Sequence, residues 1–381
     1  MRRRVLPALL ALCLLAGCAA PAPEAGDTAP DEGAEPASPV YTDWSRLTPY
    51  APPEEQYAYA AAYRADGTLL PGSDYGALLP YIGSYLNTAS YMGPLCTLGL
   101  ATADGRLVTP PVYAEIEMVR DDWRERAYAP FLLLYRGEVT ARHKEEWGSW
   151  VEGSFNLTVA APDGSWVREL PPCYGGPRLL AGDRLALALE DGSVIILDAG
   201  GNTVMSFPAS ALEPYLGEGF AWNWEGGPSL DWLNDVGQVW KYDESDPEGD
   251  GIVCWLDPDT GAVTAEPPPG YTEPEYEYQA EPELAFPGYG DNYTLTDPVT
   301  GKLYCWGTRT DGSGLRDLLD EQGRVVLEAC ELPYWIMGIE KDWISPWVWA
   351  DRIACAEDGT FCYYDPDGNC VFRRTILTDL D

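Results

Sequence analysis

The sequence predicts an all-β domain of repeated antiparallel hairpins, most closely a β-propeller of about seven blades. Asp-Gly turns recur along the chain between short β-prone runs. The 39 Gly and 34 Pro residues indicate many turns, while 12% aromatic residues can fill a core between strands. Long helical patterns are hard to find, since only residues 209–216 and 315–319 allow a helical turn or two.

The first 17 residues have the features of an export signal. Arg2, Arg3 and Arg4 precede an apolar run, residues 5–15, that is too short to span a membrane. The run ends in Leu15-Ala16-Gly17-Cys18, which resembles the lipobox of bacterial lipoproteins. The resemblance implies that Cys18 is acylated after cleavage and anchors the chain, outside the cytoplasm, to the bacterial cell membrane or envelope. An ordinary secretory signal is the alternative.

The segment after the signal is predicted to be a disordered tether. Residues 19–40 are almost wholly Ala, Pro, Gly, Asp and Glu, which cannot bury enough apolar surface to become ordered. We therefore divide the chain into a signal peptide (1–17), a lipidated cysteine with its tether (18–43) and one β-repeat domain (44–381).

The charge balance excludes one class of partner. The chain has 24 Lys and Arg against 61 Asp and Glu, a net charge of −37. Such a surface repels phosphate backbones and anionic headgroups, so we expect no nucleic-acid partner and no membrane contact except through the lipid.

Turns that begin with Asp and end with Gly mark the repeated unit. Asp can accept a hydrogen bond from the backbone two residues on, and Gly accepts a positive φ. Their irregular spacing fits units near 40 residues with insertions in some loops. The turns are Asp66-Gly67, Asp104-Gly105, Asp163-Gly164, 198–201, 257–261, 297–301, 320–323 and 365–368.

Pro-Pro-x-Tyr is a second repeated marker. It occurs at residues 110–113, 171–174 and 268–271, with a reduced form at 332–334. Proline cannot donate to the ladder of a central strand, so each copy is predicted to end a strand and redirect the chain.

Two hairpins allow their register to be predicted. In residues 185–197, a two-residue Asp191-Gly192 turn would pair Leu189 with Val194 and Leu187 with Ile196. Near the C-terminus, a two-residue turn at 358–359 would place Cys355 directly opposite Cys362. Opposed residues lie within disulfide reach, so we predict that these two are adjacent, as a disulfide or as two thiols.

The unit at residues 98–118 resembles a WG repeat, a bacterial β-repeat, through Asp104-Gly105, Pro110-Pro111, Tyr113 and the acidic-apolar run Glu115-Ile116-Glu117. Residues 98–99 stand where the Trp-Gly pair is expected, and residues 351–372 resemble the same pattern. The resemblance implies an envelope protein that mediates interactions, with no catalytic residues to carry over. An open WG-repeat β-solenoid is therefore the alternative architecture.

Catalytic motifs are weak. His143, the single histidine, is flanked by charges and is expected in an exposed loop, and the sequence has neither a G-x-S-x-G elbow nor a C-x-x-C pair. Asp365, Asp367 and Asn369 are candidate Ca²⁺ ligands, because their oxygen-bearing side chains fall at alternate positions. Ordinary structural turns are the favoured explanation, and no other cofactor is expected.

Two tryptophan clusters are candidate ligand sites. Exposed Trp beside carboxylates would suit stacking on sugar rings or a protein interface, whereas buried Trp would fill the gaps between β units. The candidates are Trp222, Trp224, Trp232, Trp343, Trp347 and Trp349. The sequence thus favours a lipid-anchored binding or scaffold protein without catalysis, with a protein or glycan partner at the envelope. A glycan-binding or carbohydrate-active propeller enzyme is the competing hypothesis.

Overall fold

The chain is all-β wherever its structure is described. The computed structural model describes residues 68–72, 74–86, 95–113, 115–120, 128–145, 148–171, 173–217, 230, 233–234, 236–241, 251–257, 259–269, 271, 283–330, 332, 348–357 and 360–376. Their helical residues are a 3₁₀ turn, Ala209–Leu212, and one α-helical turn, α1 (Glu213–Leu216). Within these ranges no helix has the length and apolar character needed to cross a membrane.

The strands of the described residues form six antiparallel sheets, numbered in chain order. Sheet 1 pairs β1 (Leu78–Leu86) with β2 (Leu95–Thr102). Sheet 2 contains β3 (Glu115–Arg120), β4 (Tyr128–Glu145), β5 (Gly148–Ala160) and β6 (Val167–Glu169). Sheet 3 contains β7 (Cys173–Leu180), β8 (Arg184–Leu189), β9 (Ser193–Leu197) and β10 (Thr203–Pro208).

The second half of the chain repeats this meander. Sheet 4 contains β11 (Gln238–Lys241), β12 (Gly251–Leu256) and β13 (Val263–Thr264). Sheet 5 contains β14 (Tyr289–Thr296), β15 (Leu303–Arg309), β16 (Arg316–Asp320) and β17 (Val325–Leu327). Sheet 6 contains β18 (Val348–Trp349), β19 (Arg352–Glu357), β20 (Thr360–Tyr364) and β21 (Cys370–Thr375).

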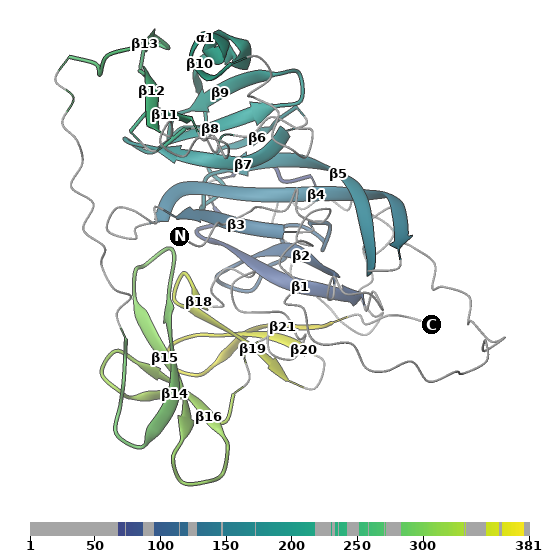
Figure 1. Ribbon diagram of the computed structural model, residues 1–381. Helices are drawn as coiled ribbons and strands as arrows, with labels where there is room; N and C mark the ends of the chain where they lie inside the picture. Colours follow the sequence, from purple (N-terminus) through teal and green to yellow (C-terminus); the bar gives the residue numbers. More distant parts are fainter. Residues whose placement is uncertain are drawn as a thin grey trace, which may run out of the picture.

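The first sheet packs against the last. Tyr363 of β20 donates a hydrogen bond to the carbonyl of Pro80, and Arg374 Nη1 of β21 donates to the hydroxyl of Tyr81 over 3.0 Å. Figure 1 shows the resulting spatial order, in which sheets 4, 3 and 2 lead to sheet 1, and sheet 1 is followed by sheets 6 and 5. The two ends of the described chain therefore meet in the middle of this arrangement.

The core lies between successive sheets and fills both of their faces. One cluster joins sheets 1, 5 and 6 with part of sheet 2, a second joins sheets 2 and 3, and a third joins sheets 3 and 4. Sheet 3 illustrates the pattern, because Leu187 packs toward sheet 2 while its neighbours Ala186 and Ala188 pack toward sheet 4. Strands covered on both faces are apolar throughout rather than alternating.

The hairpin predicted around the Asp104-Gly105 turn, in the unit at residues 98–118, is only partly formed. Its first strand and its Asp104-Gly105 turn are present, with φ of 86° at Gly105. The predicted second strand is reduced to isolated bridges, Ala101 to Leu107 and Leu98 to Tyr113. The third run, β3, belongs to the next sheet, so Pro110-Pro111 ends one sheet and redirects the chain into another.

Two local predictions were wrong. Residues 315–319 were expected to allow a helical turn, but strand β16 begins at Arg316 and continues the sheet. In the hairpin of β8 and β9, Ala188 pairs with Val194 and Leu187 with Ile195, a shift of one residue from the predicted register. The observed register leaves three residues, 190–192, in the turn, one more than predicted, and within it the amide of Gly192 donates to the carbonyl of Leu189 over 3.0 Å.

Candidate functional site

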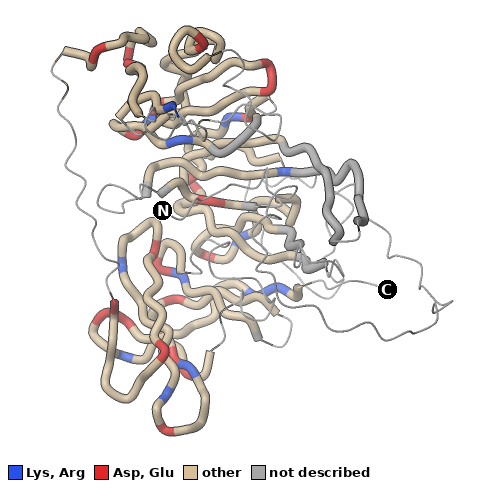
Figure 2. The backbone as a smooth tube through the Cα atoms, viewed as in Figure 1, with Lys and Arg blue, Asp and Glu red and all other residues tan. Residues whose placement is uncertain are grey.

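Most of the Asp residues that mark the repeat are bonded within their own turns. In Figure 2 the acidic residues recur at turns around the described chain. Asp198 Oδ1 shows the common geometry, accepting the amides of Gly200 over 2.9 Å and Asn202 over 2.8 Å. Equivalent bonds to the amide two residues on are made by Asp163, Asp191, Asp257, Asp297, Asp311, Asp320 and Asp365. These carboxylates act as turn caps, so their positions are explained by the turns without a bound ligand.

The proposed Ca²⁺ ligands are part of this pattern. Asp365 Oδ1 accepts the amides of Asp367 over 3.0 Å and Asn369 over 2.8 Å, and the Asn369 side-chain amide donates to both Asp365 oxygens. These hydrogen bonds, from the Asn369 side chain first, lower the pKa of Asp365. Among the described residues, no group of three or more His, Cys, Asp and Glu could hold a metal ion. The geometry is that of a capped turn, the favoured explanation from the sequence.

The tryptophan candidates are mostly outside the described residues. Trp222, Trp224, Trp232, Trp343 and Trp347 fall there, as does Cys18. Trp349 is described and fully buried in the core that joins sheets 1, 5 and 6. It has no exposed face on which a sugar ring could stack, so for this residue the packing explanation applies.

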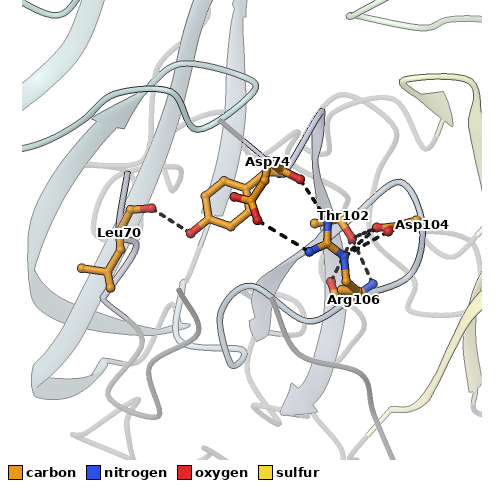
Figure 3. Close-up of polar contacts among 6 residues, drawn as sticks. Leu70, Asp74, Thr102, Asp104 and Arg106 are labelled. Carbon is orange, nitrogen blue, oxygen red and sulfur yellow. Dashed lines mark hydrogen bonds and ion pairs between the residues drawn. The ribbon is translucent and has the colours of Figure 1, made fainter. Parts of the chain in front are cut away.

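The turn of the 98–118 unit ties neighbouring segments together (Figure 3). Arg106 Nε donates to both oxygens of Asp104 over 3.1 and 3.0 Å, and Arg106 Nη2 donates to the carbonyl of Asp74 over 3.0 Å. The hydroxyl of Thr102 also donates to Asp104, and this bond is the main reason that the pKa of Asp104 is lowered. The cluster joins the segment before β1, which contains Asp74, to the turn after β2. It leaves the side chains of Asp104 and Asp74 largely solvent-exposed.

A buried carboxylate in sheet 5 is fully hydrogen-bonded. Asp317 accepts Arg309 Nε and Nη2, both over 2.7 Å, the hydroxyl of Tyr289 over 2.8 Å and the amide of Ala329 over 2.8 Å. Burial raises the pKa of Asp317, but these hydrogen bonds outweigh it and leave the pKa below its usual value. With every lone pair engaged, Asp317 is a poor general base, and its role is to hold β14, β15 and β16 together.

The hairpin of β4 and β5 is the feature that sets sheet 2 apart. β3 pairs with β4 only as far as Tyr135, and β6 pairs only with residues 158–160 of β5. Beyond these contacts the two strands continue as a pair, from Arg136 opposite Asn156 to Glu145 opposite Gly148. At about 3.3 Å per residue this two-stranded ribbon (residues 136–145 and 148–156) is roughly 30 Å long.

Sequence reasoning missed the ribbon. His143 was expected in an exposed loop, but it lies in β4 opposite Trp150 of β5. The charged run 142–146 suggested a loop, whereas a signal was available in the alternation of Val139, Ala141 and His143 with polar and charged residues. Cys355 and Cys362 were placed correctly, because the structure has them directly opposite in β19 and β20. Both are present as thiols.

Comparison with known proteins gives a match among solved structures only. No protein-family model matches it, and no curated protein matches it. Among solved structures, BamB from Moraxella catarrhalis is similar over 70% of this chain and 92% of its own, at 14% identity and a TM-score of 0.18. At this TM-score the similarity supports no conclusion about the architecture of this chain.

Proposed function

We propose that this protein is a lipid-anchored, non-catalytic binding protein outside the bacterial cytoplasmic membrane. The anchor is supported by Leu15-Ala16-Gly17-Cys18 after a basic and apolar start. The proposal of a non-catalytic role is supported by the described turn carboxylates, which are engaged in backbone hydrogen bonds. The binding role is supported by the ribbon, which extends past β3 and β6, the two outer strands of its sheet.

The ribbon suits recognition of an extended protein segment. Over residues 136–145 of β4 and 148–156 of β5, the described structure has no third strand on either edge. An edge of this length offers a row of backbone N–H and C=O groups to a partner strand. We therefore place the partner site on the ribbon and identify the partner as a protein with an extended segment.

Replacing residues 138–154 by Asn-Gly tests the binding role. This change joins Gly137 to Phe155, which face each other in the register, through a two-residue turn. Crosslinking in intact cells, followed by capture of the full chain, should yield a defined partner with the parent and lose it with the shortened variant. A matched control shortens the turn at 311–314 between β15 and β16 and should keep the partner. Equal capture by both variants would refute the ribbon as the site.

The anchor is tested separately. Cys18→Ala should release the protein from membranes and abolish incorporation of labelled palmitate. Cys13→Ala, within the apolar run, is the control and should leave both unchanged. Palmitate labelling that persists in Cys18→Ala would exclude this lipobox.

We further propose that the sheets close into a propeller. Support comes from the successive face-to-face cores and from the packing of sheet 1 on sheet 6. Small-angle X-ray scattering of residues 44–381 should give a radius of gyration of about 20 Å, the value of a compact domain. An open solenoid would give a clearly larger one.

A further inference from the structure

β5 loses its outer neighbour at a Pro-Pro pair. Leu170, just after β6, donates its amide to the carbonyl of Leu157 over 3.0 Å. Pro171-Pro172 follows in the sequence, and the chain passes into β7 of sheet 3. Proline has no N–H to donate to a ladder. From Asn156 to Gly148 the outer edge of β5 is therefore left without a neighbouring strand of the described structure.

Every second residue of β5 presents its backbone to this outer edge. In an antiparallel strand the N–H and C=O of one residue point to the same side, and successive residues alternate between the two sides. The carbonyl of Leu157 points to the outer side, where it accepts the amide of Leu170, and the register of β5 is continuous from Leu157 to Gly148. The residues that offer N–H and C=O groups to the outer edge are Ser149, Val151, Gly153 and Phe155.

The two edges of the ribbon differ in their protection against a further strand. Edge strands are commonly kept from pairing by charged residues, Lys above all, and by bulges. The β4 half of the ribbon has both features, since its register shifts at a bulge between Val139 and Ala141. Its charged residues are Arg136, Glu138, Arg142, Lys144 and Glu145. Residues 148–156 of β5 have no bulge, and Glu152 is their one charged residue, so β5 is the edge open to a partner strand.

The charge of the chain decides between two kinds of partner strand. The same edge of a second copy could pair with this one about a twofold axis. Each copy brings a net charge of −37, and the repulsion between two such chains opposes self-association. A basic segment is attracted by the same charge. The charge therefore favours a basic segment of a different protein.

We propose that the outer edge of β5, residues 148–156, binds an extended segment of a partner protein that is rich in Lys or Arg. The segment adds to the sheet as a strand in the line of β6, beyond the point where Pro171-Pro172 takes the chain away. This inference rests on the proposed binding role of the ribbon and goes further, because it assigns the edge and the chemistry of the partner.

Three short peptides of equal length test the pairing and the charge. One alternates Lys with Val, the second alternates Glu with Val, and the third alternates Lys with Pro. The third peptide keeps the charge of the first but lacks the N–H groups that a ladder needs. Fluorescence anisotropy of each labelled peptide with the full chain in detergent, at about 0.15 M salt, measures binding. We expect the Lys-Val peptide to bind at least about tenfold more tightly than either of the others.

Proline variants assign the binding to one edge. Val151→Pro removes an outward N–H from β5. Val139 is opposite Gly153 in the register, so its N–H also points away from the ribbon, and Val139→Pro is the matched change on β4. Proline is tolerated where the N–H faces away from the ladder, so both variants should keep the pairing of β4 with β5. We expect Val151→Pro to weaken binding of the Lys-Val peptide at least about tenfold and Val139→Pro to leave it unchanged.

A gentler variant covers the case in which Val151→Pro fails to fold. Val151→Lys adds to the β5 edge the kind of charge that protects natural edges and repels a basic segment, so it should also weaken binding. Thermal unfolding of each variant identifies those that are folded.

Several outcomes would overturn the proposal. They are no binding of the Lys-Val peptide, equal binding of the Glu-Val or Lys-Pro peptide, and parental binding by folded Val151→Pro or Val151→Lys. Loss of binding in Val139→Pro alone would place the added strand on β4 instead, and self-association of the parent that Val151→Pro abolishes would make a second copy the occupant. None of these results contradicts the binding role of the ribbon, which fails only if the partner is retained after residues 138–154 are replaced.

Discussion

The carboxylate of Asp297 accepts the backbone amide of Asp351 over 2.6 Å, which joins a turn of sheet 5 to a turn of sheet 6. Its other oxygen accepts the amide of Ala350 over 2.9 Å together with Val299 of its own turn. Ala350 and Asp351 both have positive φ, 53° and 57°, a strained conformation for residues other than glycine. Asp297 is fully buried, so one carboxylate stabilises both the strained turn and the contact between sheets.

Asp297→Asn is expected to weaken this junction. The substitution keeps the shape but turns an acceptor into a donor, which then faces a backbone N–H. A buried donor left without an acceptor costs about 1–3 kcal/mol of unfolding free energy. Urea titration followed by tryptophan fluorescence measures the change. Asp311→Asn, in an exposed turn where Asn can cap equally well, is the control and should differ little from the parent.

Arg309→Met is expected to destabilise sheet 5. The Asp317 side chain is 2% exposed and depends on the two bonds from Arg309, which is 28% exposed. Removing the guanidinium leaves a buried carboxylate with too few hydrogen-bond donors. We expect a loss of about 2–3 kcal/mol of unfolding free energy, which is less than for a fully buried pair because Arg309 is partly solvated. Arg309→Lys keeps the charge without the two-pronged geometry and should lose less. Calorimetry on Arg309→Met, on Asp317→Asn and on the variant that combines them gives the coupling energy, and additive effects would contradict this account.

The sequence predicted where sheets begin and end better than how their strands align. Pro-Pro-x-Tyr at 110–113, 171–174 and 268–271 lies between successive sheets, as its exclusion from central strands requires. The passage from sheet 3 to sheet 4 has no such marker and was not located. Turn glycines were also predictable, since Gly105 and Gly368 have positive φ.

Register was predictable only where the turn length was right. At Glu357 opposite Thr360 the register of a two-residue turn was confirmed, and Cys355 faces Cys362. At Asp191-Gly192 the predicted register was wrong by one residue. The pattern of apolar residues could not show the correct register. Leu187 and Ala188 are both buried because sheet 3 is covered on two faces, so either register buries apolar side chains.

Contacts of single residues between sheets could not be predicted. Cys330 approaches Cys355, and Asp297 approaches Asp351, only through the packing of whole sheets. No local pattern encodes such a distance. The same limit hid the ribbon, whose projection is defined by where β3 and β6 stop pairing.

Acid is expected to destabilise the protein through its turns. Hydrogen bonds from the same turn lower the folded pKa of each carboxyl below the unfolded value of about 3.9. The stabilisation is therefore present above that value and lost as pH falls through the folded pKa. Protonation also reduces the repulsion within a chain of net charge −37, which stabilises the folded state as pH falls. Because the two effects oppose each other, we expect maximum stability near about pH 5 and a steep loss below about pH 4. The carboxyls concerned are Asp104, Asp191, Asp198, Asp257, Asp311 and Asp365.

Thermal unfolding between pH 7 and pH 3 measures this dependence. A variant with Asp198→Asn, Asp257→Asn and Asp365→Asn keeps acceptors in three turns but removes their titration, so its acid limb should be shallower. If the stability of the parent and of the variant falls equally at acid pH, groups other than these three carboxyls cause the loss.

Gly105→Ala is expected to separate the first sheet from the last. Gly105 has φ of 86°, and an added Cβ would lie 2.1 Å from the backbone carbonyl oxygen of Val371 in β21. Gly192 has a similar φ of 81° but open space around it, so Gly192→Ala measures the backbone strain alone, about 1–2 kcal/mol. The steric clash should add about 1–3 kcal/mol for Gly105→Ala. Hydrogen exchange should then show faster opening of β21 in Gly105→Ala and not in Gly192→Ala. Equal losses of stability would mean that sheets 1 and 6 are not in contact at this turn.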